Sequence, residues 1–179
     1  MKNKKILVVL GGTSKERNVS LDSGKACVKA LKKKGFNVST FDPYKKNFNL
    51  IDKNKVDIIF NSLHGKDGED GVAQSYFEYL KIPYTHSGVL SSYNAMNKLI
   101  SKKIFNKFNI NTPLFFSIHK KNFNKSKLNE LINKKKIKFP IVVKPIDEGS
   151  SIGVKICKDF KNLFKNSKLL FKKFEELIF

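Results

Sequence analysis

The chain has 179 residues, 40% of them hydrophobic, which is enough for one ordinary domain or two small ones with a real core. Its formal net charge of +21 raises the question of nucleic-acid binding, but the lysines are scattered from Lys2 to Lys173 and form no single patch. Arg17 is the only arginine, and arginine is the usual residue for recognising bases and phosphates. We therefore expect a solvated lysine surface and no nucleic-acid partner.

The apolar runs of the chain are the length of strands and fall short of the roughly 20 residues of a membrane span. The first twelve residues superficially resemble a signal peptide, with a basic end and an apolar run. However, ILVVL leads into GGTSKER without a small-residue cleavage site, so a buried first strand is expected. The two separated cysteines, Cys27 and Cys157, do not suggest a disulfide framework. These features predict a cytoplasmic protein with no membrane partner.

The first region alternates expected strands and helices. The helix after the first strand has apolar residues at helical spacing, with Ser20 expected as its N-cap and Gly35 as its stop. Alternating strands and helices imply right-handed crossovers and a mostly parallel sheet. In chain order the expected elements are strand 4–10, helix 20–35, strand 36–42, strand 56–63, helix 72–81, short strand 82–85 and helix 94–109.

The pattern changes after Pro113. Two strands there, 139–146 and 152–157, are joined by a short connection and must therefore be antiparallel. This makes the second region α+β, and we expect two domains, 1–100 and 101–179. The other expected elements of this region are strand 114–119, helix 125–136, helix 158–174 and a strand from 175 onward.

The loop LGGTSKERNVSLDSG (10–24) lies where the first strand meets the first helix. In parallel sheets ligands gather at the carboxyl ends of strands, and this loop is at one of them. It contains neither a GxGxxG fingerprint nor a GK[ST] phosphate loop. A glycine turn leading into a capped helix is one interpretation. The other is that Glu16, expected with Arg17 in an exposed loop, holds a substrate ammonium.

The loop NSLHGKDGEDG (61–71) follows the third strand and carries His64 toward the same edge of the sheet. His64 is either structural or in contact with a ligand. The acidic residues of this loop do not match the spacing of a calcium-binding EF-hand loop. Asp70 is instead expected to cap the helix that follows.

The stretch KPIDEGSSIGVKI (144–156) connects the two antiparallel strands. It is either a hairpin turn or a nest of backbone N–H groups and hydroxyls for phosphate oxygens, with Lys144 as a nearby cation. The connection is longer than a plain hairpin needs, which favours the second interpretation. Lys98 lies on a lysine-rich helix, where most lysines are simply solvated.

Together and in this order, four stretches resemble the D-alanine–D-alanine ligase family of ATP-grasp enzymes. They are LGGTSKERNVSLDSG, SLHGKDGEDG, PYTHSGVLSSYNAMNKLISK and FPIVVKPIDEGSSIGV. The resemblance implies an N-terminal parallel-sheet domain of the pre-ATP-grasp, Rossmann-like type, followed by an incomplete α+β ATP-grasp central domain. It also implies ATP-dependent ligation of two D-alanines through an acyl phosphate, for peptidoglycan synthesis.

The resemblance assigns roles to particular residues. Glu16 is similar to the carboxylate that binds the ammonium of the first D-alanine, with His64 near the same substrate. Ser150 is similar to the hydroxyl that bonds this carboxylate and orders a mobile lid. The expected ATP-binding residues are Lys98, Lys144, Ser150, Ser151 and Gly153. A homodimer formed through the N-terminal domain is also implied only by the resemblance.

This chain differs from the family it resembles in the carboxylates available to hold a metal ion. ATP-grasp catalysis needs Mg²⁺ held by carboxylates, and after Ser151 the only acids are Asp159, Glu175 and Glu176. We therefore expect no metal ligands in this chain and a truncated, split or decayed gene. Ligation by this chain alone is not expected, and release of phosphate from Mg-ATP with D-alanine would contradict that.

Three other functions stay open at this point. They are a related D-alanine–D-lactate or D-alanine–D-serine ligase, a non-catalytic D-alanine-binding half that needs a partner chain, and a basic nucleic-acid-binding protein.

Overall fold

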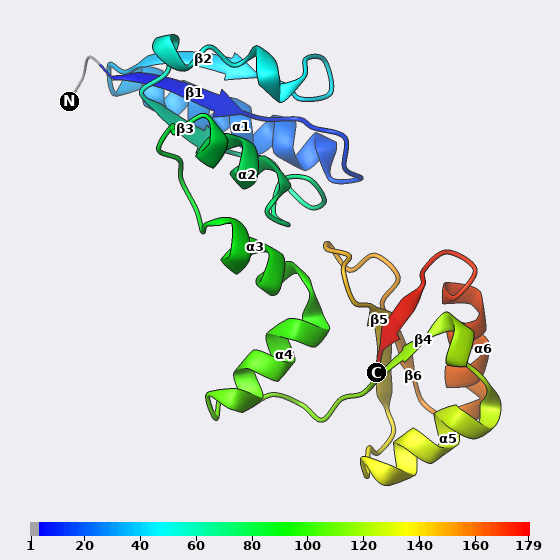
Figure 1. The fold of residues 1–179 in the computed structure, drawn as a ribbon. Helices are drawn as coiled ribbons and strands as arrows, with labels where there is room; N and C mark the ends of the chain where they lie inside the picture. The colour runs from blue at the N-terminus through cyan, green and yellow to red at the C-terminus, as the bar shows by residue number, and fades with distance from the viewer. Residues whose placement is uncertain (1–3) are drawn as a thin grey trace. The chain divides into compact units, whose positions relative to one another are not determined.

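The computed structural model describes residues 4–179. The chain divides into two compact units, Met1–Asn94 and Ala95–Phe179. Figure 1 shows both units, each with its own sheet and its own helices. We describe each unit by itself.

Unit 1 is built on a three-stranded parallel sheet in the order β2-β1-β3. The strands are β1 (Lys5–Val9), β2 (Asn37–Phe41) and β3 (Ile58–Asn61). Its helices are α1 (Arg17–Lys33) and α2 (Val72–Tyr79), with 3₁₀ turns at Phe48–Leu50 and Lys53–Lys55. Helix α3 (Val89–Met96) begins in unit 1 and ends in unit 2. The expected parallel sheet is confirmed. Helix α1 connects β1 to β2, whereas the described residues between β2 and β3 contain only the two 3₁₀ turns.

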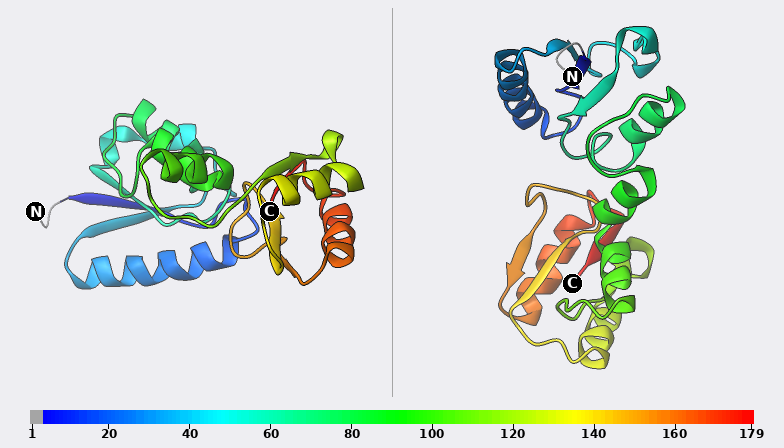
Figure 2. Two further views of the ribbon diagram at one scale, coloured as in Figure 1. Left: turned by 90° about the horizontal axis from the view of Figure 1, so that it is seen from below. Right: turned by 90° about the vertical axis from the view of Figure 1, so that its left-hand side faces the viewer.

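Helix α1 covers one face of this sheet and α2 covers the other (Figure 2). Val8 packs in the cluster that includes the apolar residues of α1, while Val9 packs in the cluster that includes Phe77 of α2. Both valines are fully buried, which explains why β1 is apolar at consecutive positions instead of alternating.

Two local expectations for unit 1 are wrong. Helix α1 begins at Arg17, so Ser20 is not its N-cap; Ser20 is fully buried inside the helix and its hydroxyl makes tertiary hydrogen bonds. The short strand at 82–85 is reduced to one parallel bridge between Tyr84 and Ile59. Gly35 does follow the end of the helix, with a φ of +84° that suits glycine.

Unit 2 is built on a four-stranded sheet in the order β4-β7-β5-β6, with every pair antiparallel. The strands are β4 (Ser117–His119), β5 (Ile141–Pro145), β6 (Lys155–Cys157) and β7 (Glu176–Ile178). The helices are α4 (Lys98–Lys107), α5 (Lys125–Lys134) and α6 (Phe160–Leu170), with a 3₁₀ turn at Lys120–Asn122.

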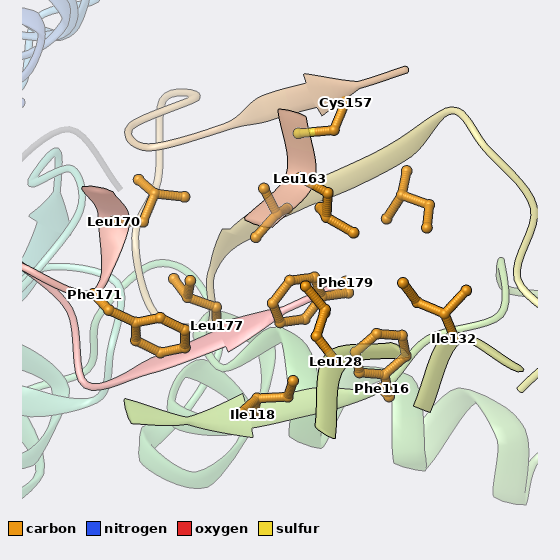
Figure 3. Close-up of a cluster of buried hydrophobic side chains, with 12 residues drawn as sticks. Phe116, Ile118, Leu128, Ile132, Cys157, Leu163, Leu170, Phe171, Leu177 and Phe179 are labelled. Atoms are coloured by element: carbon orange, nitrogen blue, oxygen red, sulfur yellow. The ribbon is translucent and has the colours of Figure 1, made fainter. Parts of the chain in front are cut away.

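The core of unit 2 lies between one face of the sheet and helices α5 and α6 (Figure 3). Leu128 of α5, Leu163 of α6 and Val143 of β5 are all fully buried in it. The rings of Phe116 and Phe179 stack with centroids 4.9 Å apart. An α+β arrangement is thus confirmed for this unit.

The single helix expected over 94–109 is interrupted. Helix α3 ends at Met96 and α4 begins at Lys98, because the side chain of Asn97 accepts hydrogen bonds from the backbone N–H groups of Leu99 and Ile100 at 3.0 and 3.1 Å. None of the helices found in residues 4–179 is long and apolar enough to cross a membrane.

Candidate functional site

In unit 1, the loops that follow β1 and β3 are tied together at the carboxyl edge of the sheet. The hydroxyl of Ser14 donates to the carbonyl of His64 at 2.7 Å. The hydroxyl of Ser20 donates to the carbonyl of Ser62 at 2.6 Å and accepts from the N–H of Gly11 at 2.8 Å. These loops therefore form one connected structure at the edge where ligands of parallel sheets gather.

The β1 loop is also tied to the end of β2, through Arg17 and Asp42. The guanidinium of Arg17 donates to both carboxylate oxygens of Asp42, at 2.7 and 2.9 Å, and to the carbonyl of Gly12 at 2.9 Å. Asp42 also accepts from the N–H groups of Gly12 and Tyr44, both at 3.1 Å. The hydrogen bond from Arg17, supported by these N–H groups, holds the pKa of Asp42 below its usual range.

Glu16 lies at the junction of these loops, as the residue that precedes α1. Its N–H donates to the hydroxyl of Ser14 at 3.1 Å, and its carbonyl accepts the first helical bond from Ser20 at 3.0 Å. Its carboxylate lies so close to Gly65 that a Cβ at that position would collide with Oε2. Gly65 also has a φ of +69°, a backbone conformation that favours glycine.

The prediction that Glu16 and Arg17 lie in an exposed loop is wrong. Both side chains are partly buried, and Arg17 is the first residue of α1. Sequence reasoning also missed the bonding of Arg17 to Asp42. The signal available was that Arg17 is the only arginine in a lysine-rich chain.

His64 lies between a hydroxyl and a carboxylate. Its Nε2 is 3.2 Å from the hydroxyl of Ser23 on α1, and its Nδ1 is 3.6 Å from Oε1 of Glu69. The imidazole is 33% exposed. Because Gly65 follows His64 directly and contacts the carboxylate of Glu16, the structure brings the two predicted substrate residues into one local arrangement.

The acidic residues after His64 bind the backbone of their own loop. Glu69 accepts from the N–H of Gly65 at 2.9 Å, and Asp70 accepts from the N–H groups of Asp67 and Val72 at 2.9 and 3.2 Å. Asp70 therefore bonds the first residue of α2, although Gly71 is the residue that precedes this helix. Within residues 4–179, no group of three or more His, Cys, Asp or Glu side chains could hold a metal ion.

An open cleft of about 440 Å³ lies on the α2 side of these loops, a size within the usual range for small-molecule sites. It is lined by the glycine loop after β1, by the segment after β2 and by His64, but not by Glu16. The aromatic rings of Phe48 and Tyr76, which also line it, stack with centroids 5.0 Å apart.

In unit 2, the predicted phosphate loop spans residues 146–154, between β5 and β6. Two successive turns shape it, with N–H···O bonds from Ile152 to Gly149 at 2.9 Å and from Val154 to Ser151 at 3.2 Å. Ser150 and Ser151 are exposed and both have positive φ, +43° and +60°. Residues other than glycine rarely adopt this backbone conformation, and such backbone strain is concentrated at functional sites.

Lys98 and Lys144 lie close to each other at the base of this loop. The N–H of Lys98 donates to the carbonyl of Ile146 at 2.8 Å, and its ammonium donates to the carbonyl of Glu148. Burial lowers the pKa of Lys98, and the charge of Lys144 lowers it further, against the opposing effect of Asp147 and Glu148. The structure therefore gathers two of the predicted ATP-binding lysines.

The combination of a parallel-sheet unit and an antiparallel-sheet unit with a glycine-serine loop is that of the ATP-grasp class, as comparison with solved structures shows. An ATP complex of the D-alanine–D-alanine ligase from Bacillus anthracis has a TM-score of 0.82 at 35% identity over 98% of this chain and 57% of that chain. The VanG D-Ala:D-Ser ligase from Enterococcus faecalis has a TM-score of 0.81 at 27% identity over 98% of this chain and 62% of that chain.

Sequence comparison identifies the family. The family model described as D-ala D-ala ligase N-terminus matches residues 42–87. The family model described as D-ala D-ala ligase C-terminus matches residues 104–179. The D-alanine–D-alanine ligase from Pelagibacter ubique is 51% identical over 177 residues, which are 98% of this chain and 56% of that protein. The chain belongs to the D-alanine–D-alanine ligase family, and it spans about half the length of the curated relatives it matches.

Proposed function

We propose that this chain supplies the first D-alanine site and the phosphate loop of an ATP-dependent D-alanine–D-alanine ligase. In this reaction a carboxylate oxygen of the first D-alanine attacks the γ-phosphorus of ATP, which releases ADP and forms an acyl phosphate. The amine of the second D-alanine then attacks the acyl carbon, and inorganic phosphate leaves. The dipeptide would serve peptidoglycan synthesis.

This chemistry requires positioned reactants and cationic groups around the moving charge more than it requires a covalent nucleophile. In unit 1, Glu16 is proposed to bind the ammonium of the first D-alanine, with His64 beside the same substrate. The close contact of the Glu16 carboxylate with Gly65, the residue after His64, supports a shared site for these two side chains.

In unit 2, the observation that carries the proposal is that Lys98 bonds the carbonyls of Ile146 and Glu148, at the start of the loop that Lys144 precedes. The positive charge of Lys144 contributes to the lowered pKa of Lys98, so the two ammonium groups repel each other. A polyphosphate bound between them would relieve that repulsion. Ser150, Ser151 and Gly153 are proposed to close over the phosphates. The hydrogen bond from Ser150 to Glu16 implied by the family resemblance stays a prediction.

The face of the unit 2 sheet opposite its core supports a nucleotide rather than a simple phosphate. Val142 and Ile156 are paired across β5 and β6, and they are 41% and 68% exposed. Lys144 is two residues beyond Val142 and therefore on the same face of the strand. An apolar surface that ends in a cation suits a flat base joined to phosphates.

ATP titration of the chain, followed by calorimetry, tests this part of the proposal. We expect saturable binding that weakens at least about tenfold in Lys144→Met, because a charge-assisted contact is lost. Lys161→Met, an exposed lysine on α6, is the matched control and should bind as the native chain does. Equal weakening in both variants, or no binding by the native chain, would contradict the proposed ATP site.

A D-alanine–D-serine ligase is the second candidate, because the fold of the VanG D-Ala:D-Ser ligase matches this chain about as well. The two candidates differ in the acceptor, so they share the proposed first-substrate and ATP sites. The two candidates are separated by offering D-alanine and D-serine together to the complete ligase and measuring which of the two is incorporated as the acceptor.

The remaining elements of the proposal follow from the family. ATP would be used as its Mg²⁺ complex, although the described residues do not themselves form a metal site. A cytoplasmic setting and a homodimer formed through unit 1 are also proposed. Gel filtration coupled to light scattering tests the dimer, which should have twice the 20.5 kDa mass of the chain.

A further inference from the structure

Arg17 is exceptional in the composition of this chain. The sequence uses lysine at every other permanently basic position, from Lys2 to Lys173. Lysine and arginine carry the same charge but differ in shape, since guanidinium is a planar fork and ammonium is a point charge. An arginine in this setting points to a task that depends on the shape of the side chain.

The contacts of Arg17 require that fork. Nη2 donates to Oδ2 of Asp42 at 2.7 Å, while Nη1 donates both to Oδ1 of Asp42 at 2.9 Å and to the carbonyl of Gly12 at 2.9 Å. The guanidinium also lies 4.4 Å from the centroid of the Tyr44 ring. The single ammonium of a lysine cannot make the two parallel bonds and this stack together.

The same contacts immobilise the backbone on both sides of Glu16. Gly12 is held through its N–H by Asp42 and through its carbonyl by Arg17, and Gly11 and Gly12 have φ values of +85° and +75°. Arg17 follows Glu16 directly. A change in the position of Arg17 therefore moves the residue whose carboxylate already contacts Gly65.

We propose that Arg17 is a positioning residue that sets the place of the Glu16 carboxylate for a substrate ammonium, and that lysine cannot replace it. Arg17 itself does not contact the substrate in this account; it acts through Gly12 and Glu16. The inference rests on the proposed role of Glu16 in binding D-alanine.

The test compares Arg17→Lys with Lys29→Arg, an exposed position on the same helix, so that each variant exchanges the same two side chains. D-alanine affinity is measured by NMR titration at a temperature where thermal unfolding shows each protein to be folded. We expect the Kd to rise about tenfold or more in Arg17→Lys and to stay unchanged in Lys29→Arg, since small misplacements of a binding group are costly.

A purely structural role would lower the melting temperature of Arg17→Lys and leave the Kd of the folded protein unchanged, and that result would overturn the inference. If the native chain binds no D-alanine, the proposed function fails, and the inference, which rests on it, fails with it.

Discussion

The loop after β1 in unit 1 and the 146–154 loop in unit 2 are stabilised by different kinds of contact. The loop after β1 is cross-linked to the ends of β2 and β3 by the side chains of Ser14, Arg17 and Ser20, and glycines occupy its left-handed positions. In the 146–154 loop, Lys98 bonds the carbonyls of Ile146 and Glu148 at the start, while two short-range turns shape the rest. Exposed serines occupy two of its left-handed positions.

This difference indicates different tasks. A loop held from several sides keeps a carboxylate in place before the substrate arrives, which avoids the cost of ordering it on binding. A loop with strained, exposed residues is suited to close over a ligand and to exclude water from an acyl phosphate.

The largest effect is expected from removing a buried aromatic ring from the core of unit 1. Phe77 is fully buried, and its ring lies 5.9 Å from that of Phe48 and 5.4 Å from that of Tyr84. Phe77→Ala should lower the free energy of unfolding by about 3–5 kcal/mol, measured by urea titration followed by circular dichroism. Phe77→Leu should cost clearly less, and equal losses in both variants would show that stability does not depend on filling this volume.

The second prediction concerns Asp42 and pH. Its folded pKa is lowered by Arg17, so its contribution to stability is present above the unfolded pKa of about 3.9 and is lost as the pH falls through the folded pKa. The difference in unfolding free energy between the native chain and Asp42→Asn should thus be full at pH 7 and shrink below about pH 4. Asp22→Asn, an exposed carboxylate on α1, serves as the control. A difference that stays constant down to pH 3 would contradict the account.

The third prediction concerns the lysines at the base of the 146–154 loop. Tripolyphosphate should raise the lowered pKa of Lys98, because a bound anion favours the charged form of its ammonium. The measurement is a pH titration of the Lys98 side-chain NMR signal with and without the ligand. Adenosine, which lacks phosphates, should leave the pKa where it is, and an equal response to both compounds would argue against a phosphate site.

The smallest effect is expected in the 146–154 loop itself. Ser151→Gly removes a left-handed penalty of roughly 1–2 kcal/mol, but glycine costs about 0.5–1 kcal/mol in entropy, so the gain in stability should be within about 1 kcal/mol. Gly153→Ala should instead destabilise the protein, since φ is +72° and a Cβ would lie 2.9 Å from the ring of Pro145. Thermal unfolding of both variants checks the opposite signs.

The type and order of most elements could be predicted from the sequence, because apolar periodicity and glycine turns are local signals. The connection between β5 and β6 was identified on this basis, as were the loops that carry Glu16 and His64. The start of α1 could not be predicted, since Ser20 resembles an N-cap but its hydroxyl bonds Gly11 and Ser62. Local patterns do not report such long-range partners.

The same limit applies to the contact between Arg17 and Asp42. These residues are far apart in the sequence, and nothing in the residues around Asp42 marks it as a partner. Only the composition, with its one arginine, indicated that Arg17 is special. The contact of Glu16 with Gly65 likewise depends on β1 and β3 being neighbours in the sheet.

The central claim is that Glu16 binds the ammonium of D-alanine, and an NMR titration of the chain with D-alanine tests it most directly. The account predicts saturable shifts of the amide signals around Glu16, His64 and Gly65 in the native chain, with much weaker binding in Glu16→Gln. L-alanine should produce smaller shifts. Native-like D-alanine affinity in Glu16→Gln, or shifts that are absent from these residues, would contradict the account.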